Sequence, residues 1–194
     1  MAETLRDKVI RAAVEYIAAS GPDGLSFRRI AADAGVSHQA PYHHFGDREA
    51  IFCEIGLEGF RRFVEVMTAP ASSEEDPDLV TRSLERYVFF ALGNVGHFRV
   101  MFRSDLCRIE RLPELQDAAD AAFETLLTLV AEVLGEGASV DEIRVMATTL
   151  WSLAHGLATL LIDGPLGATV GVALDPREFV RAVARQARAG FPAG

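Results

Sequence analysis

The sequence predicts an all-α fold of about nine helices, and three observations carry this prediction. Apolar residues recur at helical spacing along most of the chain, Gly and Pro separate these stretches, and no stretch alternates as a strand does. Apolar residues make up 49% of the 194 residues, which is enough for a sizeable core and argues against intrinsic disorder. A chain of this length holds one large domain, or a small domain joined to a larger one.

The predicted helices cover residues 4–20, two short stretches within 25–46, and then 47–67, 77–92, 97–105, 113–134, 140–163 and 176 onward. Gly21-Pro22 ends the first helix, and Asp47 is expected to cap the fourth. The segment 69–78 is rich in Pro, Ser and acidic residues, so it is the best candidate for a linker.

The stretch from Leu25 to Glu49 contains the most informative motif. Ser26 is a good N-cap, and the apolar residues after it share one helical face (Phe27, Ile30, Ala31, Ala34). Gly35 stands where this helix must end, because glycine enters the left-handed conformation without a Cβ penalty. Val36 is expected to fill the angle between two helices, and Ser37 to cap the second. The pattern indicates a helix-turn-helix, whose second helix enters the major groove of DNA.

An ordinary helical hairpin in a globular core is the alternative to a DNA-binding motif. The second helix favours DNA, because it is short and most of its side chains can donate hydrogen bonds to bases or phosphates. These polar residues are His38, Gln39, Tyr42, His43 and His44.

Four groups of residues carry a resemblance to a known family. They are Phe27-Arg28-Arg29-Ile30-Ala31, Ala34-Gly35-Val36-Ser37, Tyr42-His43-His44-Phe45 and Asp47-Arg48-Glu49-Ala50. In this order and spacing they resemble the DNA-binding part of the tetracycline-repressor-like (TetR) transcriptional regulators, and the resemblance covers the first fifty residues. A shorter stretch, Trp151-Ser152-Leu153-Ala154-His155-Gly156, is similar to the Trp and His-Gly signature of one C-terminal subtype of that family.

The resemblance implies roles for individual residues at the DNA. Tyr42, His44 and Arg48 would contact phosphates, and Ser26 and Ser37 would add hydroxyl or backbone contacts. Arg28 would reach either phosphates or bases, and Phe45 would pack in the core. The residues expected to face base edges are His38, Gln39, Ala40 and His43.

The resemblance also implies an organisation for the whole chain. Residues 1–50 would form the DNA-binding domain, and residues 51–194 a helical domain for effector binding and dimerisation. The last two helices would form the interface of a homodimer, and the effector would be an unidentified small molecule. Candidate effector-binding residues are His97, Met101, Phe102, Phe123, Trp151 and His155. Each of these is also explained as an ordinary core residue, and Trp151 and His155 would line either the cavity or the subunit interface.

A net charge of −9 is compatible with DNA binding only if most of the negative charge lies outside the DNA-binding residues. Residues 1–50 hold six Arg and Lys against seven Asp and Glu, a net of −1, so residues 51–194 carry the remaining −8. The proposed DNA face holds Arg28, Arg29 and Arg48 with three histidines between them. This modest positive footprint favours a sequence-specific dimer over non-specific coating of DNA.

The sequence gives little support for an enzyme, a metalloprotein, a secreted protein or a membrane protein. We find no catalytic or phosphate-binding motif and expect no enzyme activity, cofactor or metal site. Cys53 and Cys107 have no metal-ligand or disulfide-framework spacing, and are expected to be small apolar residues in a reduced cytosol. No secretory signal is visible, and the uncharged stretch 145–162 is more typical of a buried helix than of a membrane span. The expected location is the cytoplasm.

Two functions of other classes remain as alternatives. One is an all-α ligand-binding or carrier protein whose helix-turn-helix is purely structural. The other is a helical enzyme that uses His155 or His97.

The carboxamide of Gln39 is suited to pair with adenine through two hydrogen bonds. We therefore expect Gln39→Ala to change the base preference at one position of each half-site, with discrimination reduced by about 1–3 kcal/mol. Selection of binding sites from randomised duplexes checks this. An unchanged selected sequence would show that Gln39 reads no base.

Overall fold

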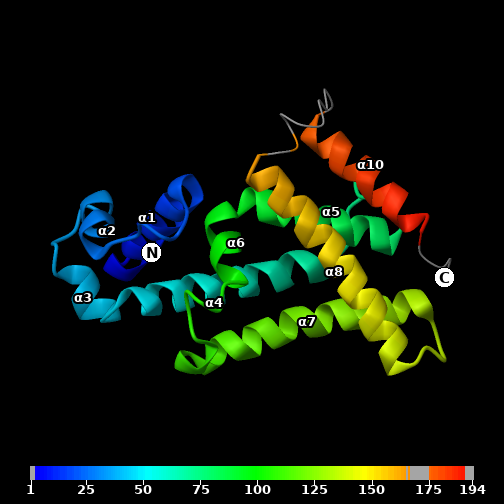
Figure 1. Ribbon diagram of the computed structural model, residues 1–194, viewed down its shortest axis with the longest axis horizontal. Coiled ribbons are helices and arrows are strands. Elements are labelled where there is room, and N and C mark those ends of the chain that lie inside the picture. The colour runs from blue at the N-terminus through cyan, green and yellow to red at the C-terminus, as the bar shows by residue number, and fades with distance from the viewer. Residues whose placement is uncertain (1–2, 165, 167–174, 191–194) are drawn as a thin grey trace. The chain divides into compact units, whose positions relative to one another are not determined.

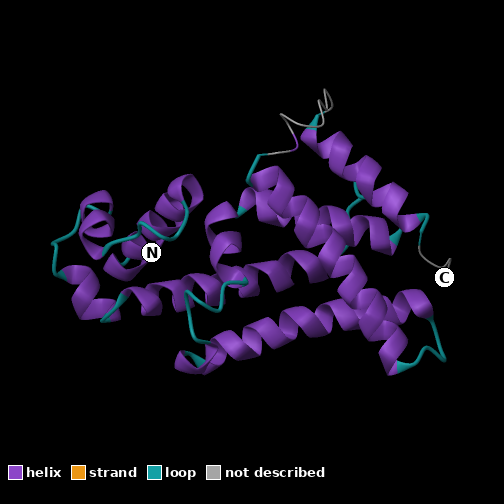
Figure 2. Ribbon diagram, viewed as in Figure 1, coloured by secondary structure: helices purple, strands orange, loops and turns teal. Residues whose placement is uncertain are grey.

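The structure is a computed structural model that describes residues 3–164, 166 and 175–190 (Figure 1). Within these residues the chain consists of helices joined by loops, without a strand, and the predicted all-α class is confirmed (Figure 2). The helices are α1 (Leu5–Ser20), α2 (Phe27–Asp33), α3 (Ala40–Phe45), α4 (Arg48–Thr68), α5 (Leu79–Gly93), α6 (Val95–Met101), the short 3₁₀ helix η1 (Ile109–Arg111), α7 (Pro113–Leu134), α8 (Val140–Ile162) and α10 (Pro176–Arg188).

The chain divides into two compact units. Unit 1 comprises residues 1–62 and 94–120, and unit 2 comprises residues 63–93 and 121–194. Segment 94–120 thus packs with the N-terminal helices, although it is distant from them in sequence. A domain boundary at residue 50 stays a prediction.

In unit 1, local signals set the first helices as the sequence predicts. Thr4 caps α1 in a reciprocal capping box with Asp7. The Ser26 hydroxyl accepts a hydrogen bond from the Arg29 amide at 3.3 Å, and Gly35 has φ +64° at the turn after α2. One cap was predicted wrongly, because α3 begins only at Ala40 and Ser37 makes no cap with its side chain. The Ser37 carbonyl accepts instead from the Ala40 amide in a turn ahead of the helix.

Helix α6 packs against α1 within unit 1. A Cβ atom at Gly96 would overlap the backbone carbonyl of Val14, so the two helices approach closely there. One guanidinium nitrogen of Arg99 donates to the carbonyls of Ile17 and Ala18 at 3.1 and 3.0 Å, at the C-terminal end of α1. A cation at this position also interacts favourably with the partial negative charge at the C-terminal end of the helix dipole.

In unit 2, α5 packs against both α8 and α10. Three arginines of α10 pair with acidic residues on or just before α5. The pairs are Arg181–Glu85 at 3.5 Å, Arg185–Asp76 at 3.2 Å and Arg188–Asp78 at 2.8 Å. Buried Val180 and Ala184 lie on the same helix, so apolar packing and ion pairs together hold α10.

Helix α8 is unusually apolar for its exposure. It is long and apolar enough to cross a membrane by length and composition, which for one helix is weak evidence because core helices pass the same test. Only 28% of its most apolar window is buried inside the chain, and Val145 and Leu160 are 68% and 45% exposed. The expectation of a helix buried on all sides is therefore not met within a single chain.

The close approach of α6 to α1 gives a stability prediction. We expect Gly96→Ala to lower the free energy of unfolding by about 1–3 kcal/mol, because the added methyl group meets backbone that cannot move away cheaply. Urea denaturation measures this. The matched control is Gly93→Ala, where a Cβ meets nothing within 4 Å. A loss in the control as large as in Gly96→Ala would contradict the explanation.

Candidate nucleic-acid interface

The short helix α3 is held against α1 and α2 by a few buried groups. Ala40 and Pro41, its first two residues, are buried. The Phe27 and Tyr42 rings meet edge to face with their centroids 4.4 Å apart, which joins α2 to α3. Gly46, with φ +75°, then ends α3 and leads into α4. The two helices and their turn form the predicted helix-turn-helix at one end of unit 1 (Figure 1).

The polar face of α3 and the turn before it points to solvent. Tyr42 is 51% exposed despite its contact with Phe27. The predicted DNA-facing residues that are exposed are Ser26, Arg28, Ser37, His38, Gln39, Tyr42, His43, His44 and Arg48. Ala40 is the exception, because it is only 7% exposed. This burial argues against the prediction that Ala40 faces base edges, because its methyl group packs inside unit 1.

Arg28 and Arg48 are placed differently on this surface. Within the described residues Arg28 has no ion pair, so its guanidinium is available to DNA. Arg48 donates to the carbonyls of Asp23 and Leu25 at 3.2 and 3.3 Å and lies over the Phe52 ring. Arg48 thus links the start of α4 to the loop before α2, in addition to any contact with a phosphate.

Two arginines from a distant segment neutralise the acidic start of α4. Glu49 accepts hydrogen bonds from the Arg108 amide and Nε, both at 3.0 Å, and from Arg111 Nη1 at 2.8 Å. Arg111 also pairs with Asp47 at 2.9 Å, and the Asp47 carboxylate caps α4 through the Ala50 amide. Hydrogen bonds from the guanidinium and the amide of Arg108, and from the Arg111 guanidinium, lower the pKa of Glu49 to about 2. We call these four residues, Asp47, Glu49, Arg108 and Arg111, the α4 clamp.

The α4 clamp joins residues that no sequence motif connects. Charge counted over residues 1–50 leaves Asp47 and Glu49 as uncompensated negative charge beside the recognition helix. The fold brings to them Arg108, which is 59 positions after Glu49, and Arg111, which is 62 positions after Glu49. No local sequence pattern predicts this pairing, because it depends on how segment 94–120 packs against residues 1–62 within unit 1.

The two cysteines also differ from the expectation. Cys53 of α4 and Cys107 in the loop before η1 form a disulfide, with their Cα atoms 5.3 Å apart. The prediction of two independent apolar cysteines is wrong in this respect. Both residues are nonetheless buried, at 2% and 8% exposure, as small apolar residues would be.

The six candidate effector-binding residues fall into two groups, one in each unit. His97, Met101 and Phe102 belong to unit 1. His97 is 5% exposed, both of its ring nitrogens lack a hydrogen-bond partner, and its Nε2 is 3.7 Å from the Glu58 carboxylate. Met101 and His97 line the space beside Gly59, where a Cβ would clash with Met101.

Phe123, Trp151 and His155 belong to unit 2, where Trp151 and His155 contact Tyr87 and Phe123 lies near Trp151. We call these four residues the Tyr87 cluster. Trp151 Nε1 donates to Tyr87 Oη at 3.2 Å, and Tyr87 Oη lies 2.9 Å from His155 Nδ1. Since Tyr87 Oη accepts from Trp151, its own proton is free to be donated to an unprotonated Nδ1 of His155. Burial lowers the pKa of His155, which also favours the neutral ring. The Phe123 and Trp151 rings are tilted by 57° to each other, with their centroids 6.2 Å apart.

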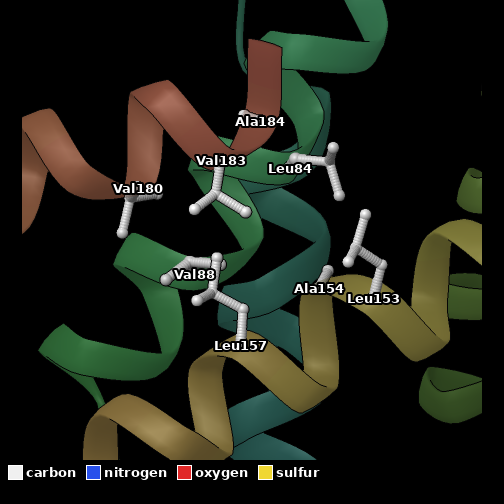
Figure 3. A pocket seen from close by; sticks show the side chains of 8 residues that line it. All are labelled: Leu84, Val88, Leu153, Ala154, Leu157, Val180, Val183 and Ala184. Atoms are coloured by element: carbon white, nitrogen blue, oxygen red, sulfur yellow. The ribbon is translucent and has the colours of Figure 1, made fainter. Parts of the chain in front are cut away.

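Unit 2 also contains a small apolar pocket where α5, α8 and α10 meet. Figure 3 shows side chains from all three helices directed toward it. The lining residues are Leu84, Val88, Leu153, Ala154, Leu157, Val180, Val183 and Ala184. None of the six candidate effector residues lines this pocket, and its walls offer no charged or hydroxyl group.

Comparison with known proteins agrees with the helix-turn-helix. The model of bacterial regulatory proteins of the tetR family matches residues 9–55. The model of the tetracyclin repressor-like C-terminal domain matches residues 80–187, which is more than half of the chain. The chain belongs to the tetR family. This TetR-family protein is a DNA-binding transcriptional regulator, and the predicted family and function are confirmed.

Individual relatives show the same relationship. The regulator is 26% identical over 145 residues to the HTH-type transcriptional repressor AcnR of Corynebacterium glutamicum, covering 66% of this chain and 77% of that protein. It is 28% identical to AcnR of Corynebacterium diphtheriae, covering 82% of each. Among solved structures, a Rhodococcus sp. RHA1 protein of unknown function is 27% identical with a TM-score of 0.73, covering 97% of this chain and 95% of that one. A tetR-family regulatory protein from Rhodococcus RHA1 has a TM-score of 0.75 at 21% identity over the full length of both chains, which shows a shared fold.

The α4 clamp predicts how this regulator responds to acid. Because the pKa of Glu49 is lowered to about 2 in the folded chain, its ionised form stabilises the fold above its ordinary pKa of 4.5. That stabilisation is lost as the pH falls from 4.5 toward 2. We therefore expect Glu49→Gln to be less stable than the native chain at neutral pH, with a smaller decline over this range. Thermal unfolding at a series of pH values measures it.

The matched control for the acid response is Glu65→Gln, at an exposed position later on α4 without a described ion pair. This control should retain the native decline between pH 4.5 and 2. An identical decline in Glu49→Gln would show that the α4 clamp does not stabilise the fold.

Proposed function

We propose that this regulator is a homodimeric repressor that binds a near-palindromic operator and is released by a small molecule. The observation that carries the proposal is the exposed polar face of α3, which presents Gln39 and His43 to solvent while Ala40 and Pro41 anchor the helix. The name of the AcnR relatives, transcriptional repressors, supports repression over activation.

At the operator, α3 would lie in the major groove with side chains in two roles. His38, Gln39 and His43 would read base edges, and Arg28 would reach bases or phosphates. Phosphate contacts would come from Ser26, Ser37, Tyr42, His44 and Arg48. The two copies of α3 in a dimer would need a separation of about 34–36 Å, one turn of B-DNA.

The exposed stripe of α8 supports dimerisation through the last two helices. The stripe comprises Val145, Thr148, Thr149, Ser152 and Leu160, with half-buried Gly156 among them. It carries no charge between Arg144 and Asp163, and its small residues permit close helix contact. A second copy of α8 and α10 would cover this uncharged stripe, including the exposed side chains of Val145 and Leu160, which would otherwise remain in water.

The Tyr87 cluster supports an effector site in unit 2. Trp151 and Phe123 are 37% and 39% exposed, so an apolar ligand can reach their rings. The hydrogen-bonded Tyr87 and His155 would provide the polar groups that orient such a ligand. The ligand would act through unequal affinity for the operator-bound and the released state of the dimer. This role involves no catalysis, and the regulator would act in the cytosol beside the DNA.

Gel-shift titration with duplexes from the DNA upstream of its own coding sequence tests operator binding. We expect a specific complex whose affinity falls by about 10³-fold or more between 50 and 200 mM salt, because phosphate contacts release counterions. Scrambled duplexes of the same composition are the control. Equal affinity for native and scrambled duplexes, or absence of any complex, would favour the carrier protein with a structural helix-turn-helix.

Variants in α8 test the dimer. Val145→Glu places a charge on the most exposed large apolar residue of the uncharged stripe, at its N-terminal end, so we expect a change from dimer to monomer in analytical ultracentrifugation and loss of operator binding. Thr128→Glu is the matched control, since residue 128 is exposed on α7, one helical turn after the acidic residue Glu124. A Val145→Glu chain that remained dimeric would place the interface elsewhere.

A further inference from the structure

The Cys53–Cys107 disulfide joins the DNA-binding helices to a distant segment of unit 1. Cys53 lies in the second turn of α4, the helix that directly follows α3 and Gly46. Cys107 is 54 positions later, in the loop between α6 and η1. The two Cα atoms are 5.3 Å apart, which lies within the range that a disulfide needs. Both thiols therefore reach each other without rearrangement of the backbone.

The same two segments are also joined by the α4 clamp. Arg108, adjacent to Cys107, pairs with Glu49 at 3.0 Å, and Arg111 pairs with Asp47 and Glu49. Glu49 is one turn before Cys53 on α4. Arg108 is 71% exposed, and ion pairs at such a surface contribute little by themselves. The disulfide is thus the strongest of the ties between the start of α4 and the loop after α6.

We propose that Cys53 and Cys107 form a redox-modification site that takes a peroxide as oxidant, and that the disulfide weakens operator binding. The direction of the effect, weaker operator binding after oxidation, rests on the proposed function as a repressor. Proteins that work beside DNA in a reducing cytosol rarely hold permanent disulfides, and cysteine pairs found there are usually transient and redox-sensing. The chain has two cysteines, and they are paired with each other, so no other thiol competes for the bond.

The chemistry balances with hydrogen peroxide as the two-electron oxidant. The thiolate of one cysteine, here assigned to the more exposed Cys107, attacks a peroxide oxygen and breaks the O–O bond, giving a sulfenic acid and, after proton uptake, water. The Cys53 thiol then attacks the sulfenic sulfur, the S–S bond forms, and the hydroxyl group leaves with the thiol proton as a second water. In sum, two thiols and one peroxide give one disulfide and two waters. A dithiol reductant reverses the modification.

Formation of the disulfide restricts the movement of α4 relative to the loop after α6. Two thiols need more room than a bonded pair, so reduction lets the start of α4 separate from residues 102–108. Since α3 is attached to the start of α4 through Gly46 and Asp47, this movement changes the orientation of the recognition helix. The reduced dimer can adjust its two recognition helices to the groove, whereas the disulfide holds them in one orientation. In a reducing cytosol the dithiol is the resting form of a repressor, so oxidation is the signal for release.

Operator affinity of the fully reduced and the peroxide-oxidised dimer tests the switch. The duplexes are selected from a randomised pool, separately by each redox form, and binding is followed by fluorescence polarisation. Differential alkylation with mass spectrometry reports the state of both cysteines. We expect at least about 10-fold weaker binding after oxidation, within the usual range of allosteric coupling, and recovery on addition of dithiothreitol.

The double variant Cys53→Ala/Cys107→Ala is the control. It retains all four methionines, so it separates disulfide formation from methionine oxidation. It should bind as the reduced chain does and should not respond to peroxide. Because Cys53 is buried in the core, the single variant Cys107→Ala is a second control that cannot form the bond.

Equal affinity of the two redox forms, or tighter binding by the oxidised form, would overturn the proposal. A disulfide that resists dithiothreitol in the folded chain would also overturn it, since the bond would then be a permanent crosslink. If neither redox form binds any duplex, the proposed repressor function fails. Hydrogen exchange then tests separately whether the disulfide changes the mobility of α4. Exchange over residues 48–62 and 102–112 that is identical in both redox forms would show that the bond does not control α4.

Discussion

The DNA-binding function of this chain depends on how six residues of α3 are held in place. A helix of this length is not stable by itself, because the first turn costs more than so few hydrogen bonds return. Burial of Ala40 and Pro41, together with the contact of Tyr42 with Phe27, supplies the missing stabilisation. The same arrangement leaves Gln39 and His43 directed to solvent. The burial that anchors one face of α3 therefore also exposes the other face, through which DNA recognition is proposed.

The electrostatics of unit 1 follow from the return of segment 94–120 to the first helices. A chain with a net charge of −9 must limit negative charge near the phosphates of DNA. The α4 clamp does this at Asp47 and Glu49, the acidic residues that follow α3 most closely. Arg29 similarly pairs with Asp33 on α2 at 2.8 Å. The effective surface at α3 is therefore less acidic than the composition of the first fifty residues indicates.

Unit 2 is organised around two different surfaces of α8. Its buried side, with Ala147, Leu150 and Ala154, packs against the rest of the unit, and Trp151 and His155 meet Tyr87. Its other side exposes the uncharged stripe that contains Val145 and Leu160. One helix thus serves both the core of a chain and the proposed contact with a second chain. This accounts for an apolar character that first suggested a helix buried on all sides.

The helices, the helix-turn-helix and the family can be predicted from the sequence alone. Those features depend on near neighbours, as with the Ser26 cap, the left-handed Gly35 and the apolar spacing of α1, so a single chain segment carries the whole signal. The burial of Ala40, the lack of a Ser37 cap on α3 and the pairing of Cys53 with Cys107 are visible only in the folded chain. The same is true of the neutralisation of the start of α4 by Arg108 and Arg111. These outcomes depend on which distant segments meet, and packing of non-local surfaces leaves no periodic pattern in the sequence of either segment.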